Sequence, residues 1–282
     1  MQSILNGFFG ETGIVRFDSY DAAFVPPAEA FDAEVVLADA AGTILARHPF
    51  RQYYELEDQV FARVGLVGPA EVQLSQPGLY NIFFVVGGEV MTRMPFVLRE
   101  AGDGGDPFAP DESWSFDGFW RQLGYMTEAS SAGHQGPEFT FWAGGLDLAD
   151  PATGEPVVAG LYDGAALIFH SKLPAGHIAP GRFARQSFHL FQPYDENAEA
   201  DAPVMTIDDL TARDGDYVLR VFRRSDNAVI RAFHLTVENG EVRQHPRAVL
   251  GYEPHMDFLL PRVTRHGQSL YGLVEAIWLE SR

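Results

Sequence analysis

Apolar and polar residues alternate in short runs along most of the chain, and this period of two indicates β-strands. In the first half the alternation predicts strands over residues 33–38, 43–46, 60–67, 70–74, 81–86 and 91–98. The loop at 39–42 ends on Gly42, and Gly87-Gly88 separates the last two strands. Glycine accepts the positive φ angles of tight turns, so we expect both segments to connect hairpin strands.

The second half continues this pattern. Residues 186–191 and 203–207 bracket an acidic loop, and the pattern predicts strands over residues 139–148, 157–162, 165–172, 218–222 and 228–237. The sequence Ser-Asp-Asn at 225–227 is typical of a turn and separates the last two of these strands. We therefore expect a second hairpin here, comparable to the one around Gly87-Gly88.

A Gly-x-Tyr unit opens a hairpin in each half of the chain. The two hairpins align without a gap, and the aligned pairs are Gly78 with Gly215, Tyr80 with Tyr217, Ile82 with Leu219, Phe84 with Val221, Phe96 with Phe233 and Leu98 with Leu235. A tyrosine at this position can pack its ring inward while its hydroxyl caps a backbone carbonyl at the corner. Duplication of one domain and independent origin of a simple alternating pattern both explain the match.

This arrangement resembles the tyrosine corner of immunoglobulin-like sandwiches, with Gln76 and Arg213 at the position where that fold often has an acidic residue. The resemblance is to a broad fold class. It implies a mainly β protein with two immunoglobulin-like or jelly-roll-like β-sandwich domains. A segment rich in Gly, Asp and Pro predicts a linker at 101–113, between a β-sandwich domain at 1–100 and a larger one at 114–282.

Two segments of the larger domain follow helical spacing. The apolar positions of the first are Trp114, Phe116, Phe119, Trp120 and Leu123, and those of the second are Leu270, Leu273, Val274, Ile277 and Trp278. They predict short helices near 115–127 and 268–279. Gly272 weakens the second helix by about 1 kcal/mol, and a final strand is the alternative there.

Charge and composition exclude several functions. The chain of 282 residues has 39 acidic and 20 basic residues, a net charge of −19 that repels phosphate backbones and argues against nucleic-acid binding. It has no cysteine, which excludes disulfides, thiolate nucleophiles and cysteine-ligated zinc. No apolar run approaches the ~20 residues of a membrane span, and the N-terminal residues lack signal-peptide features. We expect a cytoplasmic protein without a membrane partner.

Histidines and carboxylates provide the candidate metal ligands. His170, His177 and His189 lie in one stretch, where neighbouring strands could bring two of them together. Glu253, His255 and Asp257 alternate, so they would share one face of a strand. Neither set has the spacing of a known metal motif, and packed or solvated histidines explain the same residues. We expect no bound metal and no cofactor.

Catalytic and sugar-binding motifs are incomplete. The segment 267–272, Gly-Gln-Ser-Leu-Tyr-Gly, has one residue too many for a nucleophile elbow, and the glycines at 102–105 lack the strand and helix of a phosphate loop. The sequence therefore predicts no catalytic residue. The aromatic residues Trp114, Trp120, Trp142, Trp278, Tyr53 and Tyr54 could form a stacking platform for a sugar, although packing in the core or between domains explains them equally.

Arginines decorate the second hairpin of this acidic chain. Arg220, Phe222, Arg223 and Arg224 follow one another on a strand and its turn, and a ribbon of this kind presents a mixed cationic and apolar surface. We expect this surface to bind an acidic patch of a protein partner or of a second copy. Solvation of an ordinary surface is the alternative.

Three functions follow from these observations. The first is a non-enzymatic interaction or assembly protein built on tandem β-sandwiches. The second is a metal-dependent enzyme with a jelly-roll-like second domain, and the third is a carbohydrate-binding protein.

Overall fold

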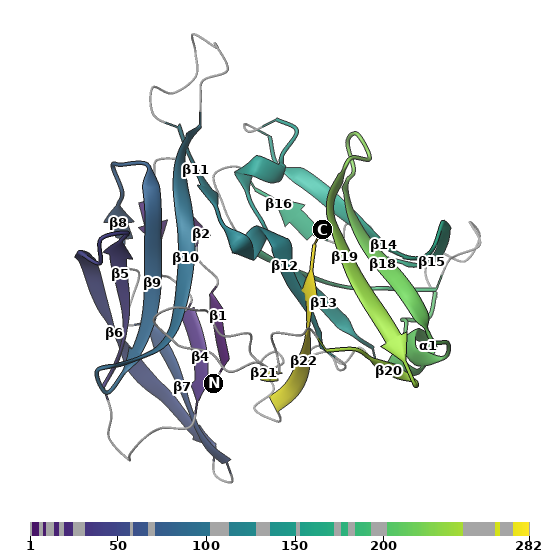
Figure 1. Cartoon of the computed structure of the whole chain (residues 1–282), viewed down its shortest axis with the longest axis horizontal. Coiled ribbons are helices and arrows are strands. Elements are labelled where there is room, and N and C mark those ends of the chain that lie inside the picture. The colour runs from purple at the N-terminus through teal and green to yellow at the C-terminus, as the bar shows by residue number, and fades with distance from the viewer. Residues whose placement is uncertain are drawn as a thin grey trace.

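The computed structural model describes residues 2–5, 8–9, 14–16, 20–24, 32–56, 59–66, 71–101, 113–127, 136–150, 153–171, 176–179, 184–192, 202–244, 263–265 and 273–281. This part of the chain is mostly antiparallel β-sheet, and its one α-helix is the short α1 (Ile207–Thr211) (Figure 1). The predicted mainly β class is therefore confirmed. Among the helices of the described residues, none has the length and apolar composition to cross a membrane.

The first half of the chain forms an eight-stranded sheet in the order β1-β4-β7-β6-β5-β9-β10-β11. Its strands are β1 (Gln2–Leu5), β4 (Tyr20–Phe24), β5 (Ala33–Asp39), β6 (Ile44–Leu56), β7 (Gln59–Leu66), β9 (Gly78–Val86), β10 (Glu89–Ala101) and β11 (Ser113–Asp117). A small sheet contains β2 (Phe8–Phe9), β3 (Ile14–Arg16) and β8 (Glu71–Gln73). Gly42, Gly87 and Gly88 have positive φ, as their turns require.

The second half forms two larger sheets. The five-stranded sheet has the order β17-β13-β12-β22-β21, and the six-stranded sheet has the order β15-β14-β18-β19-β20 with β16 beside β14. The strands of the first are β12 (Leu123–Thr127), β13 (Glu138–Ala143), β17 (Ala184–His189), β21 (Val263–Arg265) and β22 (Leu273–Glu280). Those of the second are β14 (Glu155–Asp163), β15 (Ala166–His170), β16 (Gly176–Ile178), β18 (Gly215–Arg223), β19 (Val229–Glu238) and β20 (Glu241–Val242).

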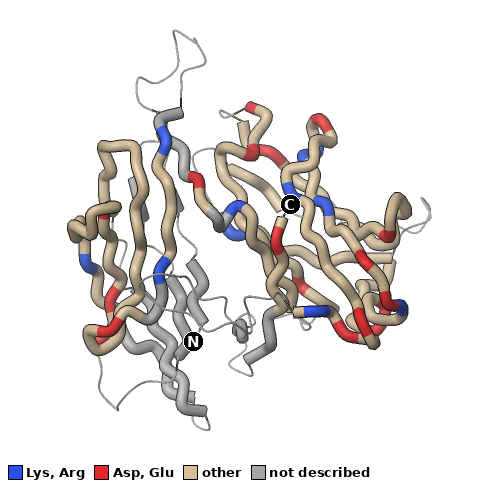
Figure 2. The backbone as a smooth tube through the Cα atoms, in the orientation of Figure 1, with Lys and Arg blue, Asp and Glu red and all other residues tan. Residues whose placement is uncertain are grey.

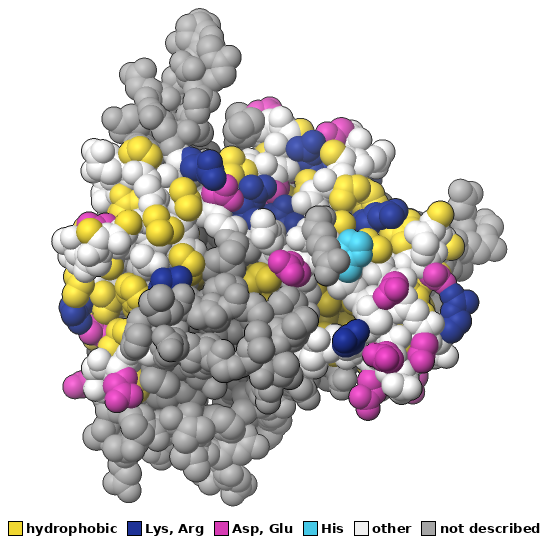
Figure 3. All heavy atoms as spheres, in the orientation of Figure 1, with side chains coloured by type: hydrophobic (Ala, Val, Ile, Leu, Met, Phe, Trp, Pro, Cys, Tyr) yellow, Lys and Arg dark blue, Asp and Glu magenta, His cyan; other side chains and the backbone are white. Residues whose placement is uncertain are grey.

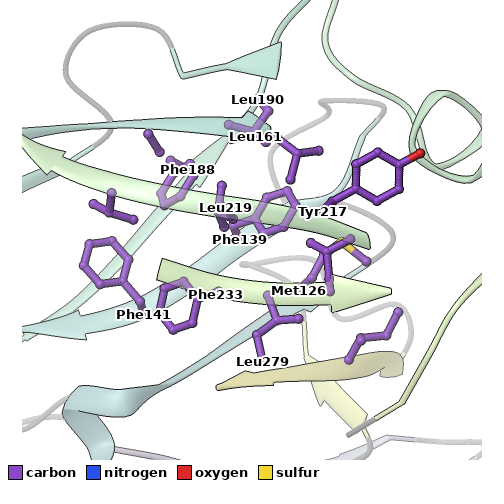
Figure 4. Close-up of a cluster of buried hydrophobic side chains, with 14 of the residues drawn as sticks. Met126, Phe139, Phe141, Leu161, Phe188, Leu190, Tyr217, Leu219, Phe233 and Leu279 are labelled. Carbon is purple, nitrogen blue, oxygen red and sulfur yellow. The ribbon is translucent and has the colours of Figure 1, made fainter. Parts of the chain in front are cut away.

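These two sheets pack face to face across one apolar cluster (Figure 4). Phe139 and Phe141 of β13 meet Leu219 and Phe233 of β18 and β19, and each of these side chains is at most 1% exposed. Two isolated β-bridges also connect the sheets. His170 of β15 bridges Phe191, which follows β17, and Phe233 of β19 bridges Ser281, which follows β22. The six-stranded sheet therefore has one buried face and one outer face.

Both predicted tyrosine corners form. The Tyr80 hydroxyl donates a hydrogen bond to the Gln76 carbonyl at 2.6 Å, and the Tyr217 hydroxyl donates to the Arg213 carbonyl at 2.7 Å. Both rings are buried, and Figure 4 shows the Tyr217 hydroxyl directed away from the apolar cluster. Gly78 has a φ of +151°, whereas Gly215 does not adopt a positive φ.

The two corner hairpins differ in strand register. Tyr80 pairs with Phe96, whereas Tyr217 pairs with Leu235, the counterpart of Leu98. The reason is the length of the turn, which is Gly87-Gly88 in the first hairpin and residues 224–228 in the second. The gap-free alignment therefore matches residues that lie on the same face of the strands. It does not match the residues that pair with them across each hairpin.

We expect Tyr80→Phe and Tyr217→Phe each to lower the free energy of unfolding by about 1–1.5 kcal/mol, because each leaves a corner carbonyl without its hydroxyl donor. Urea unfolding measures the change. Tyr162→Phe is the matched control, because no described group is hydrogen-bonded to the Tyr162 hydroxyl. Equal losses in all three variants would contradict a specific contribution of the corners.

The predicted helices near 115–127 and 268–279 are wrong. The first segment contains β11, the 3-10 helix η1 (Phe119–Gln122) and β12, and the second contains β22. All five residues of β12 are buried, as are Ile277, Trp278 and Leu279 of β22. A strand that is covered on both faces has apolar residues on both, and such a run imitates helical spacing.

Strand β11 follows the predicted linker and returns to the first sheet. It pairs with β10, from Val97 with Asp117 to Ala101 with Ser113. The eight-stranded sheet therefore includes residues that we assigned to the second domain. Residues 102–112 lie outside the described part of the chain, and the division into domains at 1–100 and 114–282 stays a prediction.

Candidate interaction surface

Strand pairing places the side chains of the outer face of the six-stranded sheet in successive rows, three of which lie next to one another over β14, β18 and β19. One row contains Leu167, Tyr162, Val218 and His234, the next contains His170, Gly160, Arg220 and Ala232, and the third contains Val158, Phe222 and Val229. The alternate residues Leu161, Leu219 and Phe233 point into the apolar cluster, so these rows face outward. Leu167 and Val229 are 44% and 51% exposed.

Three side chains of this face form what we call the Arg220 cluster: Arg220, Tyr162 and Phe222. A Cβ atom on Gly160 would lie 2.7 Å from a Leu167 methyl carbon and 3.0 Å from the Tyr162 ring, so these side chains cover its backbone. The Arg220 guanidinium carbon lies 4.6 Å from the centre of the Tyr162 ring, and the Phe222 ring centre lies 6.3 Å from it at an interplanar angle of 65°. A cation on an aromatic face beside a second ring is a typical anchor of protein interfaces.

The charges of the outer face contrast with the rest of the chain. The three rows contain no acidic residue, whereas the next row of the same face contains Asp216 beside Thr236, and Glu238 follows it on β19. Among the described residues, no carboxylate pairs with Arg220 or Arg224. Figure 3 shows hydrophobic, arginine and histidine side chains together over β18 and β19, with acidic side chains toward α1 and β20.

The predicted set of partner-binding residues is only partly brought together. Arg220 and Phe222 share the outer face. Arg223 instead donates two hydrogen bonds to the Asp226 carboxylate, at 3.1 and 2.7 Å, and one to the Asp147 carbonyl at 3.4 Å. Arg224 lies exposed in the turn at the end of β18. Sequence reasoning missed Tyr162, because it belongs to a strand far away in the chain.

A buried ion-pair network is the second site that sequence reasoning missed. Asp147, in the 3-10 helix η2 (Gly145–Asp147), accepts hydrogen bonds from Arg231 at 2.8 and 2.9 Å, from Arg121 at 2.6 Å and from the Gly144 amide at 2.9 Å. The side chains of Asp147 and Arg231 are 2% and 5% exposed. Burial would raise the pKa of Asp147, but the hydrogen bonds and charges of Arg231 and then Arg121 hold that pKa below its ordinary value.

This network connects the two halves of the chain. Arg121 also lies 3.5 Å from Asp117 of β11, and Asp117 pairs with Arg99 of β10 at 3.0 Å. Figure 2 shows these basic and acidic segments next to one another where β11 leads into η1. The sequence contains one signal for it: on β19, Arg231 has the same parity as the buried Phe233 and Leu235. An inward-facing arginine requires a buried anionic partner.

The candidate metal ligands do not assemble into a site within the described residues. His170 and His189 each make a hydrogen bond between Nδ1 and a backbone carbonyl, of Ser171 at 2.9 Å and of Pro137 at 3.0 Å, and His177 is exposed. No group of three or more histidine and carboxylate side chains suited to a metal occurs in the part of the chain that the structure describes. Glu253, His255 and Asp257 lie outside that part.

Two of the tryptophans proposed for sugar stacking are buried. Trp142 and Trp278 are each 3% exposed and stack on one another, with ring centres 6.3 Å apart, and Tyr125 packs against both. Packing explains these residues, and they cannot form an exposed platform. The side chains of Trp114, Trp120, Tyr53 and Tyr54 are not described.

Comparison with protein-family models, with curated proteins and with solved structures finds no match to this chain.

Proposed function

We propose that this is a non-enzymatic interaction or assembly protein with two immunoglobulin-like or jelly-roll-like β-sandwich domains, and that the outer face of its six-stranded sheet binds an acidic protein surface. The observation that supports this best is the Arg220 cluster. In this acidic chain, the guanidinium of Arg220 lies on the face of the Tyr162 ring, and no carboxylate among the described residues pairs with it. Such a cation attracts acidic surfaces, and the three rows around it contain no carboxylate that would repel them.

The size of the face limits the affinity. Four strands about 4.8 Å apart and three rows about 7 Å apart span about 400 Å². Stable interfaces bury about 800 Å² on each partner, so the outer face alone is of the size of a weak, transient interface. This is typical of transient interaction and of assembly through repeated weak contacts.

The other two functions receive less support. Sugars stack on exposed aromatic faces, and the guanidinium of Arg220 already covers one face of Tyr162. A metal enzyme requires converging ligands, which the described histidines do not provide. The cytoplasmic location stays a prediction.

Selection from a random peptide library on the purified protein tests this function. We expect the enriched peptides to combine acidic and apolar residues, and to bind Arg220→Glu and Phe222→Ser at least tenfold more weakly, because these variants remove the cation or its aromatic support. Arg47→Glu is the matched control: its side chain is 53% exposed and lies on β6 of the other half. Enrichment of uncharged or basic peptides, or equal binding by all variants, would contradict the proposal.

A further inference from the structure

A second charged surface lies at one end of the six-stranded sheet, and we call it the acidic end. It contains Asp208 and Asp209 of α1, Asp214 just before β18, Asp216 of β18, Glu238 of β19 and Glu241 of β20. Arg213 and Arg243 are the basic residues nearby in sequence, and Arg213 is paired with Asp163. Figure 2 shows acidic residues concentrated along the backbone around α1 and β20, and Figure 3 shows acidic side chains on the surface there.

The β19–β20 hairpin gives the acidic end an unbalanced charge. Glu238 and Glu241 are directly opposite each other across the hairpin, and both are exposed. Among the described residues, no cation pairs with either carboxylate. Like charges directly opposite one another destabilise a strand pair. A cation from outside this chain would relieve that repulsion.

A third carboxylate is fixed next to this pair. Asp214 accepts hydrogen bonds from the Asn239 and Gly240 amides, both at 3.0 Å, in the turn between the two glutamates. The backbone hydrogen bonds from Gly240 and then Asn239 favour the ionised carboxylate and lower the pKa of Asp214 below its ordinary value. The hairpin therefore presents three carboxylates in a defined arrangement.

We infer that the outer face of one copy of this chain binds the acidic end of a second copy. This inference rests on the proposed function and names its partner. The two surfaces complement each other in charge, since Arg220 and Arg224 lack carboxylate partners among the described residues and Glu238 and Glu241 lack cations. Both surfaces belong to one sheet, and Glu238 lies six residues along β19 from Ala232, the residue that pairs with Arg220. That separation is about 20 Å along the strand, so the two surfaces of one copy cannot pair with each other.

Such a contact closes a dimer when a two-fold axis makes it reciprocal. Without that axis it is heterologous, and it leaves a free face on one copy and a free acidic end on the other. Further copies can then add at both positions, so the association is open-ended unless the rotation closes a ring. Because the interface is small and charged, it is weakened by salt, whose screening length is about 8 Å at physiological ionic strength. The state of assembly should therefore depend on both protein concentration and salt.

Sedimentation velocity on charge-reversed variants of the full chain tests this inference. The first variant is Arg220→Glu with Arg224→Glu, and the second is Glu238→Arg with Glu241→Arg. The wild type should associate at micromolar concentration and dissociate as salt rises. Each variant alone should be monomeric, with the dissociation constant raised at least tenfold, because its two surfaces then carry the same charge. Mixing the variants should restore association, since the reversed face of one complements the reversed end of the other.

The controls separate this inference from the proposed function. Arg47→Glu adds negative charge on the other half of the chain, half as much as the first variant does, and should associate like the wild type. Circular dichroism verifies that every variant is folded. A monomeric wild type at all concentrations would overturn self-association, whereas binding of acidic peptides to the outer face would still support the proposed function. Association that persists in both variants, or a mixture that stays monomeric, would also overturn the inference.

Discussion

Asp147→Ala should lower the free energy of unfolding by about 3–5 kcal/mol, because it leaves buried arginine charge without compensation. The Asp147 carboxylate is the acceptor for both terminal nitrogens of Arg231 and for one of Arg121. The Arg231 side chain is only 5% exposed, so hydration cannot compensate for the loss of this carboxylate. Urea unfolding, followed by far-ultraviolet circular dichroism, measures the loss.

Two comparisons show whether burial is responsible. Asp226→Ala breaks the surface pair with Arg223 and should leave the unfolding midpoint nearly unchanged, because exposed ion pairs contribute little. Replacing the buried pair by Asp147→Leu with Arg231→Met should recover most of the stability, since no charge is then left buried. If Asp147→Ala lowers the free energy of unfolding no more than Asp226→Ala does, the buried network does not stabilise the fold.

The cost of Asp147→Ala should also depend on pH in one direction. The pKa of Asp147 is lower in the folded chain than in the unfolded chain, so its contribution is complete above the unfolded value, near 4, and is lost as pH falls through the folded value. The difference between wild type and variant should therefore be constant from neutral pH to about 5 and shrink in stronger acid. A difference that grows on acidification would indicate the opposite sign of the pKa shift.

The alternation of side chains was sufficient to predict the hairpins and their corners. Gly87-Gly88 and both corner tyrosines have the roles that their residue types indicate, because turns and corners depend on local backbone geometry. The two helices were wrong for a tertiary reason. Strands β12 and β22 are covered on both faces, and no local signal separates a doubly buried strand from a buried helix.

The candidate surface required information that a single strand does not contain. Arg220 and Phe222 could be identified from their ribbon, but Tyr162 reaches them only because β14 pairs with β18 in a particular register. A shift of that register by one residue would turn Tyr162 into the core. Arg231 was detectable in principle from its inward parity, while Asp147 was not, because η2 is an irregular segment that only the fold brings beside β19.

Phe233→Ala should lower the free energy of unfolding by about 3–5 kcal/mol, the usual cost of emptying a large aromatic site in a core. The Phe233 ring lies in the centre of the cluster, with its centre 6.4 Å from that of Phe141. A Cβ on Gly124 would come within 3.1 Å of the Phe233 ring, so that ring fills the space beside the glycine. Chemical unfolding of the purified variant measures the loss.

Phe222→Ala is the matched comparison for Phe233→Ala. Both residues are phenylalanines of the same hairpin, but Phe222 points to the opposite face of the sheet. Its loss should cost about 1 kcal/mol or less, since the ring is not part of the buried cluster and packs only on the exposed side of the sheet. A loss as large as that of Phe233→Ala would mean that the outer face is needed for folding. A small loss together with weakened binding would mean that this half-buried ring contributes more to binding a partner than to folding.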